Sequence, residues 1–187
     1  MRYVNRKQVE VPEFYYSEEV TNFKKKIDSF LKNKNNEYQY ERVPRPENYA
    51  SKDARESVMK LFNNKCAYCE TKNASTFDHF RPMGAAERFN GEVDKNHYSW
   101  LAMDWDNVYS VCIECLQYKR NLFPVKEVGT IGSKISFLRK QEDAYLLDPC
   151  YNKPENHLFI NLNGELEALS EKGRVSIDIL NLNRFSL

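Results

Sequence analysis

Two closely spaced cysteine pairs constrain this chain more than any other feature of its sequence. Cys66 and Cys69 form the first pair, Cys112 and Cys115 form the second, and 42 residues separate the two pairs. A CxxC turn presents two thiolates to one metal ion, and two such turns complete the four-sulfur shell of a structural zinc ion. A single pair also fits a thioredoxin-like redox motif, but two pairs favour zinc. We therefore expect a fold built around one four-cysteine zinc site.

The composition indicates a globular protein with one main core. The chain has 187 residues, of which 41% are hydrophobic. Five cysteines are an odd number, which argues against a disulfide framework, and we interpret Cys150 as a buried thiol. The sequence has neither a long apolar run nor a signal-peptide pattern, so we expect a cytoplasmic protein without a membrane segment. The net charge of +1 means that any attraction for nucleic acid must come from a local patch.

Three regions are expected along the chain. The first, residues 1–50, contains a predicted helix from Ser17 to Lys32, with Ser17 as its N-cap, followed by a polar connection with several prolines. The second, residues 51–126, begins with a helix that leads into the first cysteine pair. The third, residues 127–187, is expected to pack on this core.

The third region is predicted to hold a hairpin and a helix. The stretch 125–143, which spans the start of this region, is interpreted as a loop because two glycines interrupt any regular pattern, and 144–150 is interpreted as a short apolar strand. In 157–169 the apolar residues alternate, and Asn163 and Gly164 suit a two-residue type I′ turn. A helix is expected to begin near residue 173.

The segment between the cysteine pairs carries residues suited to phosphodiester chemistry. Such hydrolysis needs an activated water and a cation that stabilises charge on the phosphate. The imidazole of His79 suits the first task because its pKa lies near neutrality, and Asp78 offers a hard oxygen ligand for Mg²⁺ or Mn²⁺. Neighbouring residues in a regular strand point to opposite faces, so both reach one phosphate only at a strand end or a bulge. The alternative is a histidine that packs among Phe77, Phe80 and Pro82.

Several motifs, in order, resemble the HNH endonucleases of anti-phage defence, in particular the Septu-type PtuB group, which is also found as a retron effector. The motifs lie within about residues 50–187 and read KCAYCE, DHFRP, YSWLAMDWDN, CIEC followed by KRNLFP, YLLDPC and LNR. The resemblance implies an α+β fold whose ββα-metal (HNH, treble-clef-like) core is stabilised by the four-cysteine zinc site. It also implies that His79 is the general base, that Asp78 binds the catalytic ion and that Asn107 orients the histidine loop.

One position departs from the pattern of this family. The residue directly after the second CxxC is usually a His or Asn that binds the catalytic ion, and here it is Leu116. Asn121 or Gln117 can replace it, or one protein ligand and water molecules can hold the ion. A weakened or lost nuclease is a further alternative, in which the chain is a zinc-stabilised interaction subunit with a decayed HNH site.

The expected partners follow from the resemblance and from local charge. Arg81, Lys119 and Arg120 are predicted to contact phosphate, with ordinary surface charge as the alternative. The resemblance implies a nucleic-acid substrate, DNA before tRNA, and a PtuA-like ATPase that restrains the nuclease. No sequence motif reads bases, and none fixes the stoichiometry with the ATPase. Related proteins are expected to continue beyond the LNR motif, so a shortened form is a further interpretation.

Overall fold

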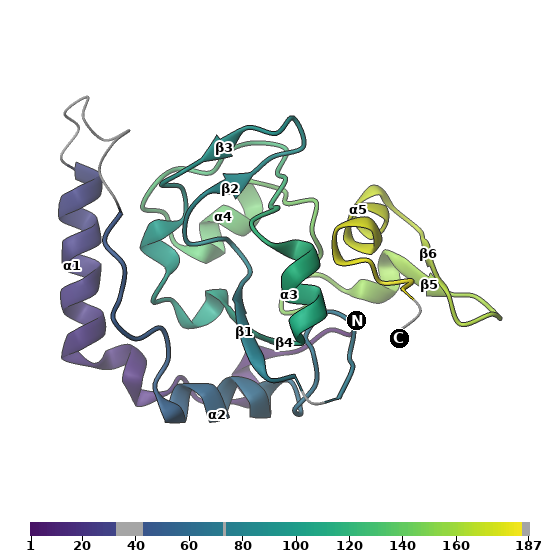
Figure 1. Cartoon of the computed structure of the whole chain (residues 1–187), viewed down its shortest axis with the longest axis horizontal. Helices are drawn as coiled ribbons and strands as arrows, with labels where there is room; N and C mark the ends of the chain where they lie inside the picture. Colours follow the sequence, from purple (N-terminus) through teal and green to yellow (C-terminus); the bar gives the residue numbers. More distant parts are fainter. Residues whose placement is uncertain (33–42, 73, 185–187) are drawn as a thin grey trace.

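A computed structural model of the chain describes residues 1–32, 43–72 and 74–184 (Figure 1). Its helices and strands are α1 (Glu18–Lys32), α2 (Lys52–Leu61), β1 (Thr76–His79), β2 (Ala86–Glu87), β3 (Val93–Asp94), β4 (Val108–Val111), α3 (Ile113–Lys119), α4 (Ile135–Gln141), β5 (Leu158–Ile160), β6 (Leu166–Ala168) and α5 (Glu171–Leu180). The fold is mixed α+β, with α1 at one end of the long axis and the β5–β6 hairpin with α5 at the other. Among the described residues, no helix combines the length and the apolar character that a membrane crossing requires.

Both helices predicted before the first cysteine pair are confirmed. The Ser17 hydroxyl accepts a hydrogen bond from the Val20 amide at the start of α1, and Ser51 does the same for Ala54 at the start of α2. The apolar face of each helix is buried, as its periodicity predicted; the buried residues are Val20, Phe23, Ile27, Ala54, Val58 and Leu61. Most of the polar connection between the helices, 33–42, lies outside the described residues.

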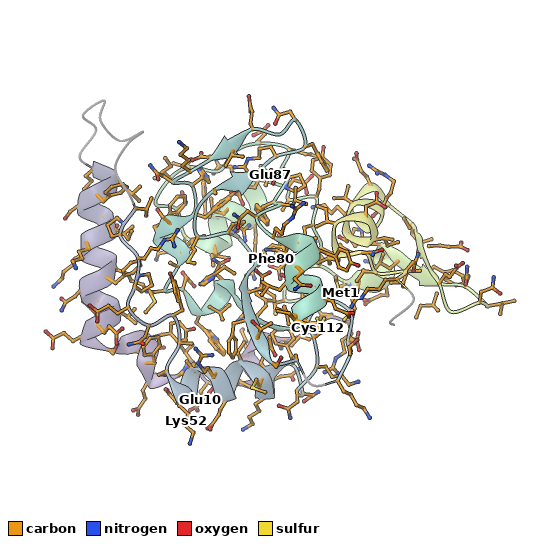
Figure 2. The ribbon with its side chains drawn as sticks, viewed as in Figure 1. Met1, Glu10, Lys52, Phe80, Glu87 and Cys112 are labelled. Carbon is orange, nitrogen blue, oxygen red and sulfur yellow. The ribbon has the colours of Figure 1, made fainter. Side chains whose placement is uncertain are left out.

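The centre of the molecule is an antiparallel pair of strands followed by a helix. β1 pairs with β4 in regular register, with Asp78 opposite Tyr109 and His79 opposite Val108. Phe80 continues from β1 into the core, where its ring centroid lies 5.4 Å from that of Tyr109. Figure 2 shows Phe80 and Cys112 in the middle of the molecule. β4 leads directly through Cys112 into α3, so the second cysteine pair begins this helix.

Two predictions for the third region were wrong. Residues 125–143 contain α4, whose Ile135 and Leu138 are buried one turn apart. Gly129 precedes this helix and permits close packing, since a Cβ there would collide with the side chains of Leu138 and Glu142. Residues 144–150 form no strand, because their backbone groups bond to a loop and a side chain: the Tyr145 amide donates to the Pro124 carbonyl, and the Leu147 amide to the Ser176 hydroxyl.

The predicted C-terminal hairpin and helix are present, although the turn differs. β5 and β6 pair antiparallel, and the Gly164 amide donates to the Asn161 carbonyl at 3.0 Å. Gly164 has φ +84°, but Asn163 is not in the left-handed region, which a type I′ turn requires of both central residues. The alternating apolar side chains are not all buried either: Leu158 packs inside, whereas Ile160 is 65% exposed.

Candidate metal centre and catalytic site

The four paired cysteines form one cluster. Cys66 and Cys69 follow α2, and Cys112 and Cys115 lie at the start of α3; all four sulfur atoms lie within 4.8 Å of one another. Zinc–sulfur bonds in a tetrahedral site place the sulfurs about 3.8 Å apart. The separation of 3.6 Å between the sulfurs of Cys69 and Cys112 matches this arrangement. The residues therefore fit a structural zinc ion.

Backbone hydrogen bonds hold the first cysteine turn against the central strands. The Ala67 amide donates to the Ser110 carbonyl in β4 at 2.8 Å, and the Glu70 amide closes the turn on the Cys66 carbonyl at 3.0 Å. Interactions with the thiols of Cys115 and Cys66 lower the pKa of Cys69. Cys150 lies outside the cluster as a partly buried thiol, and its burial raises its pKa to about 11.

The carboxylate of Asp78 is already held by protein groups. Lys119 places its Nζ 2.9 Å from Oδ2 and 3.2 Å from Oδ1, and the Tyr68 hydroxyl donates to Oδ2 at 2.8 Å. Asp78 and Lys119 are both buried. Burial, reinforced by Asp78, raises the pKa of Tyr68 well above its ordinary value, so the phenol stays a hydrogen-bond donor. The Lys119 ammonium group thus competes with a divalent ion for the Asp78 carboxylate.

His79 makes a different set of contacts from its neighbour. Its Nε2 lies 2.9 Å from the Ala102 carbonyl, and its ring lies edge-on to Tyr49 with centroids 5.9 Å apart. A carbonyl only accepts, so Nε2 carries the proton and the neutral ring keeps a lone pair on Nδ1. Burial lowers the pKa of His79 below the ordinary 6.5 and outweighs the opposing contact with Ala102. The ring is therefore held neutral with one nitrogen able to accept a proton.

Asp78 and His79 diverge in the structure. Both take part in consecutive pairs of the β1–β4 ladder, so their side chains leave the strand on opposite faces. β1 ends at His79, but no bulge turns the two side chains toward one another. In this conformation Asp78 faces Lys119 on α3, whereas His79 faces Ala102.

Asn107 fixes the backbone just after His79. Its Oδ1 accepts from the Arg81 amide at 2.8 Å, and its Nδ2 donates to the carbonyls of Arg81 and Leu101 at 2.9 and 3.3 Å. The Asn107 carbonyl also accepts from the Phe80 amide at 2.9 Å. The buried side-chain amide of Asn107 therefore fixes the backbone conformation of the residues that follow His79.

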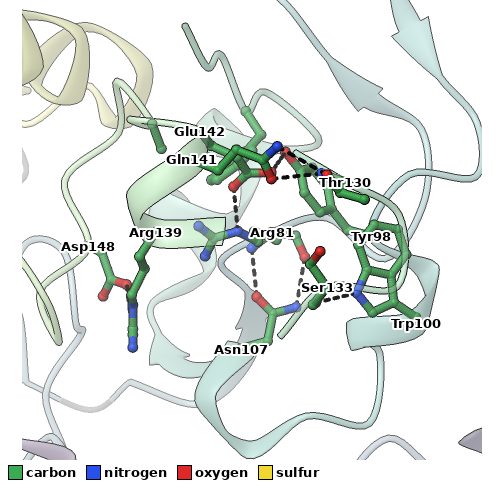
Figure 3. A network of polar contacts seen from close by, with 12 residues as sticks. Arg81, Tyr98, Trp100, Asn107, Thr130, Ser133, Arg139, Gln141, Glu142 and Asp148 are labelled. Carbon is green, nitrogen blue, oxygen red and sulfur yellow. Dashed lines mark hydrogen bonds and ion pairs between the residues drawn. The ribbon is translucent and has the colours of Figure 1, made fainter. Parts of the chain in front are cut away.

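Arg81 belongs to a buried network (Figure 3). Its Nε donates to Glu142 Oε2 at 2.9 Å, and the Tyr98 hydroxyl donates to Oε1 of the same carboxylate at 2.6 Å. Arg81 is 1% exposed and Glu142 is fully buried. Arg81 and Lys119 both lie in the interior, so neither is exposed for a phosphate contact in this structure.

The other predicted residues lie around the end of α3. Leu116 packs against the hydrophobic core, whereas Gln117 and Asn121 are exposed. Within the described part of the chain, no hydrogen bond or ion pair joins the side chain of Gln117 or Asn121 to Asp78. Arg120 is exposed, which leaves it as the one predicted phosphate-binding cation at the described surface.

Arg184 also contacts the cysteine cluster, although the sequence predicted no role for it. Its place in the LNR motif was the one sequence feature that pointed to this residue.

The fold and the site define a small mixed α+β protein with a four-cysteine cluster that can hold zinc. The chain is similar to parts of two Septu proteins of Bacillus mycoides (strain KBAB4). It is 39% identical over 144 residues to the Septu protein PtuA, an alignment that covers 74% of this chain and 20% of that relative. It is 33% identical over 150 residues to the Septu protein PtuB, which covers 75% of this chain and 50% of that relative.

The two alignments overlap in this chain, so it shares a common region with both relatives. The chain spans at most about half the length of either relative. No family model matches the chain, and no solved structure matches it.

Proposed function

We propose that the chain is a metal-dependent HNH-type endonuclease that hydrolyses nucleic-acid phosphodiester bonds in an anti-phage defence system. The observation that carries the proposal is the position of His79. This neutral histidine ends β1, which pairs with β4, and β4 leads into α3 at the cysteine cluster. A ββα-metal core has this order of elements. Similarity to two proteins named Septu supports the defence role.

In the proposed reaction, His79 Nδ1 accepts a proton from the attacking water. Asn107 acts as a positioning residue, because it fixes the chain directly after His79 through bonds to Arg81. Mg²⁺ or Mn²⁺ would neutralise charge on the phosphate and on the leaving oxygen. Asp78 can bind such an ion only after Lys119 moves away, so the proposal requires this ion pair to open when substrate binds.

The proposed partner is a PtuA-like ATPase, and the proposed substrate is DNA, with tRNA as the alternative. The resemblance in sequence implies both, and the name of one relative, PtuA, supports the partner. Arg120 is the exposed cation nearest in sequence to Lys119 and is proposed to contact phosphate.

A second function is favoured by a specific observation. Lys119 neutralises Asp78, and Leu116 stands at the usual position of another metal ligand. In this alternative the catalytic ion site is lost and the zinc-stabilised fold serves as an interaction subunit.

Cleavage assays distinguish the two functions. The purified chain, alone and with a PtuA-like ATPase, is incubated with plasmid, single-stranded DNA or tRNA in Mg²⁺ or Mn²⁺. His79→Ala is the test variant, and His157→Ala is the control, because His157 contacts Ser170 in the C-terminal region. The nuclease proposal expects cleavage by wild type and by His157→Ala but not by His79→Ala. Cleavage by His79→Ala at the wild-type rate contradicts the assignment of the base, and no cleavage of any substrate under any condition favours the interaction subunit.

A further inference from the structure

Arg184 places its guanidinium group against the four-cysteine cluster. Its Nη2 lies 3.5 Å from Cys69 Sγ and 3.8 Å from the sulfurs of both Cys112 and Cys115. The side chain is 5% exposed. Three of the four expected zinc ligands are thus within hydrogen-bonding reach of one cation that follows α5.

The same guanidinium group is fixed from two other sides. Its Nη1 donates to the carbonyls of Leu180 and Asn181 at 3.3 and 3.1 Å, at the C-terminal end of α5. Its Nη2 also pairs with Glu114 in the first turn of α3 at 3.1 Å. Arg184 therefore connects the end of α5, the start of α3 and the cysteine sulfurs.

The charge of the loaded site explains why a cation belongs there. Four thiolates around Zn²⁺ carry a net charge of −2, and an unpaired buried charge is costly. Hydrogen bonds from outer groups hold the ligands and raise metal affinity. Glu114 offsets part of the positive charge of Arg184, but its side chain is 41% exposed and solvent screens it, whereas the contacts with sulfur are buried.

We propose that Arg184 is a positioning residue of the zinc site, and that its guanidinium group couples the docking of α5 to metal binding. By linkage, whatever strengthens zinc binding through Arg184 must also strengthen the packing of α5 when zinc is bound. The apolar face of α5, with Val175 and Leu180 buried, supplies the rest of its attachment. This inference does not depend on whether the chain is a nuclease.

The first experiment measures zinc retention. Arg184→Met removes the charge and the donors but keeps an apolar stem of similar length. Arg174→Met is the matched control, because the Arg174 side chain lies on α5, is 60% exposed and pairs with Asp178 one turn further along the same helix. Zinc transfer to a chromophoric chelator should be at least about 10-fold faster for Arg184→Met, and unchanged for Arg174→Met.

The second experiment measures the coupling itself by hydrogen exchange. In wild type, removal of zinc should lower the protection of amides 171–180 more than that of α1. Arg184→Met should show this lower protection even with zinc bound. The proposal is overturned if folded Arg184→Met retains zinc as wild type does. If Arg184→Met does not fold, Arg184→Gln and zinc-free wild type provide the test. The proposal is then overturned if Arg184→Gln transfers zinc at the wild-type rate. It is also overturned if removal of zinc from wild type leaves the protection of the α5 amides unchanged.

Discussion

Lys119 joins the helix that starts at the cysteine cluster to the strand that carries the candidate base. Its Nζ lies 2.9 Å from Asp78 Oδ2 and donates to the His79 carbonyl at 3.0 Å. Both members of the ion pair are buried, and Tyr68 satisfies the same carboxylate. Lys119 thereby connects the helix that begins at the cluster with the strand that ends at His79, so the pair has a structural role whatever the chemistry of the site.

Removing Lys119 should destabilise the protein strongly. Lys119→Met leaves the buried carboxylate of Asp78 without its cation, which typically costs about 3–5 kcal/mol. Asp78→Asn should likewise leave the buried ammonium unpaired. The double variant should lose clearly less than the sum of the two losses, because neither charge is then left alone. Urea unfolding at neutral pH measures all four free energies of unfolding, and additive losses would show that the two groups do not interact.

Local sequence signals predicted much of the fold, because neighbouring residues determine them. Ser17 and Ser51 cap helices within one turn, and the spacing within each CxxC motif defines its own turn. α4 was missed because Gly129 was interpreted as a break, although it permits the packing of the helix that follows.

The surroundings of the candidate site depend on contacts that sequence spacing does not define. Lys119 is 41 residues from Asp78, and Arg81 is 61 residues from Glu142. With 28 Lys and Arg residues and 27 Asp and Glu residues, no pattern in the chain selects these pairs. Both cations were therefore interpreted as phosphate contacts, and only the three-dimensional structure shows that they are buried.

Acid should weaken the fold partly through His79. Burial lowers its pKa below 6.5 in the folded state, so the unfolded chain binds the proton first as the pH falls. Well above pH 6.5 the His79 ring is neutral in both states and costs no stability. Below that pH the free energy of unfolding decreases, because only the unfolded chain readily takes up the proton. The free energy of unfolding between pH 7 and pH 5 should therefore fall more steeply for wild type than for His79→Gln. Equal slopes would contradict a lowered pKa of His79 in the folded state.

If His79 is the base, the same shift extends activity to acid pH. The neutral imidazole accepts a proton, and its lowered pKa keeps it neutral below pH 6.5. The acid limb of the cleavage rate should lie below pH 6.5 when measured over a range in which the protein stays folded. An acid limb above that value would indicate a different base or a substrate-bound His79 in another environment.

Loss of one cluster cysteine should release zinc. Cys112→Ser removes one of the four cysteines expected to bind zinc, and with it the sulfur that accepts the Cys115 amide at the start of α3. Structural zinc contributes directly to folding, so a melting temperature lower by more than about 10 °C is expected. Cys150→Ser is the control, because that thiol lies outside the cluster. Zinc content by atomic absorption checks both variants, and one tightly bound zinc with normal melting in Cys112→Ser would refute the four-cysteine site.

Arg120 allows its backbone and its charge to be tested separately. It has φ +47° and ψ −126°, a conformation that glycine adopts easily and other residues adopt at a cost of about 1–3 kcal/mol. Arg120→Gly should therefore raise the free energy of unfolding by about 1 kcal/mol, whereas Arg120→Ala keeps the strain. Both variants lose the exposed cation, so both should weaken nucleic-acid binding equally, and the slope of log K against log salt should fall by about 0.9 if Arg120 contacts one phosphate. Fluorescence anisotropy with labelled DNA at several salt concentrations measures that slope, and a slope equal to that of wild type would remove Arg120 from the proposed interface.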